Sequence, residues 1–117
     1  MLPVDRDAAL LWDMLQACLE IRDFTRGVVW EDFIADRKLC LAVERCLEIV
    51  GEAAGRISKP FCAAHPEIPW SLITGMRNVL AHDYGQIEYE IIYGTVTRNV
   101  PSLLVTLERL LPGSLDP

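Results

Sequence analysis

Hydrophobic residues recur at every third or fourth position over most of this chain, which is the spacing of one face of an α-helix. The pattern predicts four main helices, and the segments between them contain Pro, Gly or Trp. Their expected ranges are about 5–26, 36–57, 69–82 and 87–111. No stretch alternates apolar and polar residues as a half-buried strand does. The sequence therefore predicts an all-α fold, an up-and-down bundle of four main helices with short connections.

The first predicted helix is more apolar than a surface helix needs to be. Its hydrophobic residues form two stripes, Ala8, Leu11, Leu15, Cys18 and Leu10, Met14, Ala17, Ile21, Phe24. Together the stripes cover an arc of about 240°, against roughly 100° for an ordinary amphipathic helix. We expect one stripe to face the chain's own bundle and the other a partner subunit, so the pattern predicts a two-fold dimer.

Two connectors and one proline affect the rest of the predicted bundle. The segment VVWEDFIADRK is expected to form a short helical turn or a loop, and KPFCAAHPEIPW, with its three prolines, is expected to be a connector. Pro101 falls inside the last predicted helix, where its ring and missing N–H disrupt the hydrogen-bond ladder. We therefore expect that helix to be kinked or divided.

Gly51 and Gly55 lie inside the second main helix. Each glycine costs about 1 kcal/mol relative to Ala in a helix interior. We therefore expect a packing reason, namely that bare backbone lets a neighbouring helix come close. Glu52 lies between them and is either a solvated charge or a partner for a buried base.

Length, charge and cysteines limit the class of protein. The 117 residues fit one domain, residues 1–117, and the formal net charge of −6 argues against a protein that coats nucleic acids. The four cysteines form no C-x-x-C pair, so we expect free thiols rather than a zinc site; they are Cys18, Cys40, Cys46 and Cys62.

No signal-peptide pattern and no apolar run of membrane-spanning length is visible, so we expect a cytoplasmic protein without a membrane segment.

The segment GMRNVLAHDY contains the residues best suited to chemistry. On an ideal helix Arg77 and Tyr84 project within about 20° of each other, whereas His82 points about 140° away from Arg77. Either a helix end near His82 or a two-fold partner is needed to bring the imidazole and the guanidinium into one cleft. An Arg that binds phosphate and a His that transfers protons suit phosphodiester cleavage.

No acidic metal-binding cluster accompanies this segment, so attack by a ribose 2′-OH is the natural mechanism, and RNA the natural substrate. Spacing alone leaves a second interpretation open, in which His82 is only a helix cap or a packed side chain. If RNA binds, its affinity must come from a small basic patch, formed by Arg77 with Arg45, Arg56 or Arg98.

The segment resembles the R-x4-H-x-Y signature of HEPN-domain toxins of the HepT type. The likeness extends to DRKLCLAVERCLEIVGEAAGRIS, to IPW at residues 68–70 and to IEYEIIYGTVTRNVPSLLVTLERLL, and so covers about residues 5–111 in order. It implies a HEPN-like helical bundle that forms a homodimer, with Arg77 and His82 of both chains lining a cleft at the interface.

The resemblance further implies a metal-independent RNA endonuclease without a cofactor, acting as the toxin of a toxin–antitoxin pair. Arg77 and His82 would be catalytic, and Asn78 and Tyr84 would contact or support the RNA. The antitoxin would be a minimal nucleotidyltransferase that neutralises the toxin by adding AMP to Tyr84, because a bulky anion there repels RNA phosphate. The alternative is a non-catalytic HEPN module that dimerises and binds a nucleotidyltransferase or a nucleotide.

Overall fold

The computed structural model describes residues 3–81 and 86–111, and these residues form only helices and the turns between them. In chain order the helices are α1 (Pro3–Thr25), α2 (Trp30–Ala35), α3 (Arg37–Arg56), α4 (Lys59–Ala64), α5 (Trp70–Ala81), α6 (Gln86–Arg98) and α7 (Val100–Leu110). The all-α class is therefore confirmed for the described part of the chain.

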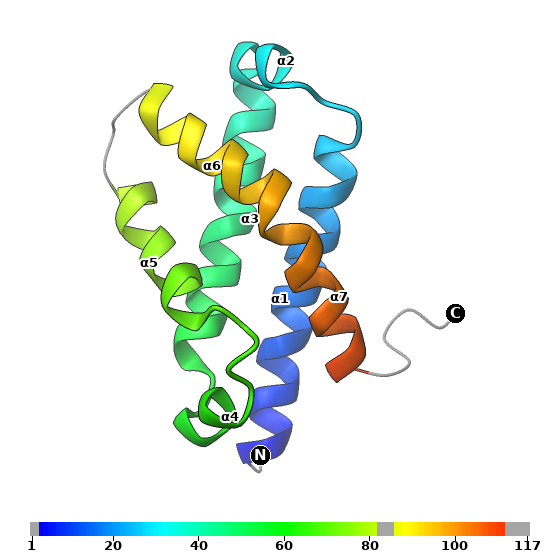
Figure 1. The fold of residues 1–117 in the computed structure, drawn as a ribbon, viewed down its shortest axis with the longest axis vertical. Coiled ribbons are helices and arrows are strands. Elements are labelled where there is room, and N and C mark those ends of the chain that lie inside the picture. The colour runs from blue at the N-terminus through cyan, green and yellow to red at the C-terminus, as the bar shows by residue number, and fades with distance from the viewer. Residues whose placement is uncertain (1–2, 82–85, 112–117) are drawn as a thin grey trace.

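The long helices run alternately up and down the molecule (Figure 1). Helices α1 and α3 form the antiparallel centre, α5 packs on α3, and α7 packs on α1. Helices α6 and α7 follow each other across one face of this pair, and α2 closes the top by contacting α3 and α6. This is the expected bundle of four main helices, with α6 and α7 together as the fourth.

The helix boundaries follow from local chemistry. The Asp36 carboxylate accepts a hydrogen bond from the Leu39 N–H at 3.0 Å and so caps the start of α3. Gly27 has φ of 72°, a left-handed conformation that glycine adopts without strain, and it follows the end of α1. Pro101 lies in the first turn of α7, where a proline is tolerated, so the last predicted helix is divided at Asn99.

Helix α4 was not expected from the sequence, which indicated only a connector between α3 and α5. Ser58 caps this short helix by accepting the Phe61 N–H at 3.3 Å, and Pro60 lies in its first turn. The Ser58 hydroxyl and N–H also donate to the buried Asp7 carboxylate, at 2.6 and 2.9 Å. The three prolines suggested a connector, but one of them, Pro60, is in a first-turn position that helices tolerate, two residues after the capping residue Ser58.

The expected dimer was inferred from the idea that one stripe of α1 needs a partner subunit to cover it, and this idea was wrong for most of the stripe. Leu11, Leu15 and Cys18 of the first stripe are buried, and so are Met14, Ala17 and Ile21 of the second. The middle of both stripes is covered within one chain, because α3 packs on one side of α1 and α7 on another, while Phe24 at the end of the second stripe is 42% exposed. The dimer itself stays a prediction, and the buried middle of α1 does not supply its surface.

The cysteines are free thiols, as expected. Cys18, Cys40 and Cys46 are buried, and Cys62 is partly buried. Burial, with a smaller contribution from Cys46, raises the pKa of the Cys18 thiol to about 12. Within residues 3–81 and 86–111, no three His, Cys, Asp or Glu side chains are placed to hold a metal ion. In the same part of the chain, none of the helices combines the length and hydrophobicity that crossing a bilayer requires.

Candidate functional site

The start of α5 is fixed by the connector before it. The Trp70 indole N–H donates to the His65 carbonyl at 3.0 Å, and the Trp70 ring meets Phe61 edge-on at 6.4 Å. Ile68, two residues before Trp70, is only 2% exposed. These contacts anchor the first turn of the helix that carries Arg77 and Asn78.

Arg77 lies across the backbone of α3 at the two glycines. A Cβ atom built on Gly51 would be 3.1 Å from Arg77 Cγ and 3.6 Å from Cδ. A Cβ atom on Gly55, one turn further along α3, would be 3.9 Å from Arg77 Nη1. The expected packing reason is therefore confirmed for Gly51, whose bare backbone lets the stem of Arg77 approach α3, whereas the contact at Gly55 is one that an alanine would also allow.

The exposed Arg77 side chain borders a hollow of about 210 Å³ that Glu48, Glu52 and Leu80 also line. Glu48 forms an ion pair with Arg45, in which Nη1 and Oε2 are 3.2 Å apart. Sequence reasoning singled out Glu52 but missed Glu48. The spacing in the sequence could have indicated Glu48, because residues four apart lie on the same face of a helix, and Glu48 is four residues before Glu52.

The structure describes half of the predicted site residues. Arg77 and Asn78 are both exposed on α5, but Asn78 does not line the hollow beside Arg77. His82 and Tyr84 lie outside the described residues. The requirement that a helix end or a partner subunit bring His82 to Arg77 therefore stays a prediction.

The start of α6 is held against α3 by a polar network that the sequence did not suggest. Arg37 Nη1 donates to the Tyr89 hydroxyl at 2.8 Å. Burial, followed by a hydrogen bond with the Glu44 carboxylate, raises the pKa of the Tyr89 phenol to about 12. The phenol thus stays protonated and joins the two helices on the α6 side of the motif.

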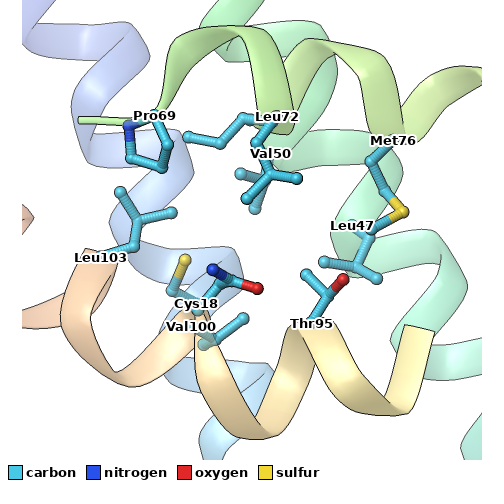
Figure 2. Close-up of a pocket in the computed structure, with 11 residues that line it drawn as sticks. Cys18, Leu47, Val50, Pro69, Leu72, Met76, Thr95, Val100 and Leu103 are labelled. Carbon is cyan, nitrogen blue, oxygen red and sulfur yellow. The ribbon is translucent and has the colours of Figure 1, made fainter. Parts of the chain in front are cut away.

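A second, apolar cavity lies on the other side of α5. Its volume is about 30 Å³, and the residues that line it come from α1, α3, α5, α6, α7 and the connector before α5. Figure 2 shows their side chains around the cavity. Leu72 and Met76 of α5 face Thr95 and Val100 of α6 and α7 across this cavity, with Cys18 of α1 at its base. Leu72 remains 45% exposed, so this face of the bundle is incompletely covered within one chain.

Known proteins match almost the whole of this helical unit. The profile of the family described as Ribonuclease HepT-like matches residues 14–110. A protein of Thermococcus cleftensis named "Probable ribonuclease HepT" is 41% identical over 100 residues, which cover 86% of this chain and 91% of the relative.

Two further relatives carry the name "Putative RNase". One, from Methanocaldococcus jannaschii, is 35% identical over 103 residues, covering 88% of this chain and 85% of its own length. The other, from Caldanaerobacter subterraneus, is 37% identical over 98 residues, covering 84% and 88%. No solved structure matches the chain. A family profile that spans α1 to α7, together with relatives of matching length, places this chain in the HepT-like ribonuclease family.

Proposed function

We propose that this protein is a metal-independent RNA endonuclease and the toxin of a toxin–antitoxin pair. Membership of the HepT-like ribonuclease family supports RNA as the substrate. The observation that carries the proposal is the position of Arg77: its stem is seated on the α3 glycines while its side chain borders a solvent-open hollow. A guanidinium held in this way can bind two oxygens of a phosphodiester.

The reaction follows from the residue types of the R-x4-H-x-Y segment. Arg77 binds the scissile phosphate and stabilises the charge that develops on it as the ribose 2′-OH attacks. His82 transfers a proton to or from the reacting oxygens, for which imidazole is suited near neutral pH. Asn78, exposed beside Arg77, supports the arginine or contacts the RNA, and Tyr84 provides a further RNA contact.

A two-fold dimer would complete the site, and the α5–α6 face is the surface we propose for it. Leu72 on α5 and Ile91 on α6 are 45% and 42% exposed, and the apolar cavity of Figure 2 lies between their helices. Helix α5 carries Arg77 on its α3 side and Leu72 on its cavity side. A second copy that covered this face would therefore contact α5, the helix that carries Arg77.

Control by a nucleotidyltransferase antitoxin follows from the tyrosine of the motif. AMP attached to Tyr84 would add negative charge to the segment that carries Arg77 and repel RNA phosphate. Co-expression with the cognate transferase is expected to add AMP mass to the wild type and none to Tyr84→Phe. Modification of another residue, or no added mass in the wild type, contradicts this mode of control.

The alternative function is a non-catalytic module that binds a nucleotidyltransferase or a nucleotide through the same residues. One observation favours it: the hollow beside Arg77 has two carboxylates, Glu48 and Glu52, which repel a polyanion. The overall charge of −6 acts in the same direction.

Growth and RNA integrity after expression separate the two functions. Expression of the wild type is expected to arrest growth and fragment cellular RNA, whereas His82→Ala, expressed to the same level, does neither. If growth and RNA are the same with both proteins, the enzymatic function is refuted and the binding function is favoured.

A further inference from the structure

The two carboxylates beside Arg77 differ in what holds them. Glu48 is engaged by Arg45 at 3.2 Å. Glu52 is exposed, and among the described residues it has no hydrogen bond or ion pair. Arg77 and Glu52 nevertheless line the same hollow of about 210 Å³. Glu52 therefore presents an uncommitted carboxylate to whatever Arg77 binds.

Cleavage of RNA by its own 2′-OH needs two proton transfers. A base takes the proton of the attacking hydroxyl, and an acid protonates the leaving 5′-oxygen. Among the residue types of the R-x4-H-x-Y segment, only histidine has an ordinary pKa near neutral. A second proton-transferring group is therefore required, unless one imidazole performs both steps or a second chain supplies another.

The position of Glu52 suits the first of these transfers. An isolated carboxylate beside a phosphate-binding arginine weakens RNA binding by charge repulsion, so it needs a compensating interaction. A ribose 2′-OH provides one, because it donates a hydrogen bond to a carboxylate, whereas DNA has no such donor. The same carboxylate would thus distinguish RNA from DNA and be placed to take the proton.

We propose that Glu52 is the general base of the cleavage reaction, which rests on the ribonuclease function proposed above. The Glu52 carboxylate takes the proton from the 2′-OH, and the 2′-oxygen forms a bond to phosphorus while Arg77 binds the non-bridging oxygens. The bond between phosphorus and the 5′-oxygen breaks, and the 5′-oxygen takes a proton from His82. The products are a 2′,3′-cyclic phosphate and a 5′-hydroxyl.

The first arm of the experiment compares three variants of the full chain in RNA cleavage assays with EDTA. Glu52→Gln is expected to lower kcat by about 100-fold or more, since general base catalysis contributes on the order of 10²–10⁴. Glu48→Gln removes the same charge from the same hollow, and it is expected to lower KM with kcat changed less than about threefold. His82→Ala tests the proposed function separately.

The second arm asks whether a carboxylate in solution can replace the missing one. Activity of Glu52→Ala is expected to rise with formate concentration, and not with chloride at equal ionic strength, because the small side chain leaves room for the base. A merely structural role of Glu52 would not produce this rescue. Equal folding of the variants is checked by circular dichroism and by thermal unfolding.

The outcomes separate the inference from the function on which it rests. Loss of activity in Glu52→Gln, together with formate rescue of Glu52→Ala, supports the general base. If wild type cleaves and His82→Ala does not, but Glu52→Gln stays within about threefold of wild type, the inference is overturned and the ribonuclease function stands. Loss without formate rescue also overturns it. Equal RNA cleavage by wild type and His82→Ala overturns the proposed function itself.

Discussion

Replacing Gly51 by Ala puts a methyl group where the stem of Arg77 now lies. The new Cβ would be 3.1 Å from Arg77 Cγ, 3.6 Å from Cδ and 3.5 Å from the Ile73 carbonyl oxygen. Comfortable contacts between carbon atoms are about 3.5–4.0 Å, so only the contact with Cγ is too short. The backbone of α5 can stay in place, and the arginine stem must move by a few tenths of an ångström.

The effects on stability and activity are expected to have opposite directions. Alanine stabilises a helix interior by about 1 kcal/mol relative to glycine, which offsets the local crowding. The free energy of unfolding should therefore stay the same or rise, within about 1 kcal/mol. The guanidinium lies beyond the displaced Cγ and moves with it, and misplacement by about 1 Å can cost on the order of 10² in rate. We expect kcat/KM to fall by about tenfold or more, or about 1.4 kcal/mol.

Two other glycines provide matched controls. Gly75 lies two residues before Arg77 on α5, and a Cβ added there would meet nothing within 4 Å beyond its chain neighbours and the backbone of its own helix. Gly55 would bring its Cβ to 3.9 Å from Arg77 Nη1, an ordinary contact. Urea unfolding, light scattering and RNA cleavage are measured for Gly51→Ala, Gly55→Ala and Gly75→Ala, with the largest activity loss expected in Gly51→Ala.

Equal kcat/KM for Gly51→Ala and Gly75→Ala, with equal mass in solution, would refute the seating of Arg77 on α3. A loss of more than about 2 kcal/mol of unfolding free energy in Gly51→Ala would also contradict the reasoning, since it would mean that the arginine stem cannot move aside.

Three further predictions concern the rest of the chain. The pKa of the Tyr89 phenol is raised to about 12 in the folded protein, so the unfolded state loses this proton first as pH rises above about 10. The free energy of unfolding should therefore fall between pH 10 and 12, and it should fall less in Tyr89→Phe. Asp7→Ala removes an acceptor at 2.6 and 2.9 Å, and should cost about 2–3 kcal/mol in urea unfolding. Leu72→Arg should convert a dimer to a monomer in light scattering, whereas Val105→Arg, 56% exposed on α7, should not; a wild-type monomer at micromolar concentration would refute the dimer.

Hydrophobic spacing predicted the main helices, because helix amphipathicity is a local property that each stripe shows by itself. Pro101 indicated that the last helix is kinked or divided, which depends only on proline's own geometry, and the division falls at Asn99. Hydrophobic spacing could not show what covers each stripe. The second stripe of α1 was assigned to a partner because nothing in a single helix shows that α7, about 80 residues later, returns to cover it.

The candidate site was predictable in its residue types but only partly in its geometry. Two costly glycines indicated a close approach to α3, but only the fold identifies Arg77 as the side chain that lies on them. Likewise, Glu52 had two open interpretations in the sequence. Its place beside Arg77 depends on the packing of α5 against α3, which brings together residues 25 positions apart.

The central claim is most directly tested by incubating a defined RNA with the purified protein in EDTA and identifying the ends of the fragments. Wild type is expected to produce fragments ending in a 2′,3′-cyclic phosphate, and His82→Ala, with the same fold and mass, is expected to produce none. Equal cleavage by the two proteins, intact RNA with both, or cleavage that requires added metal would contradict it.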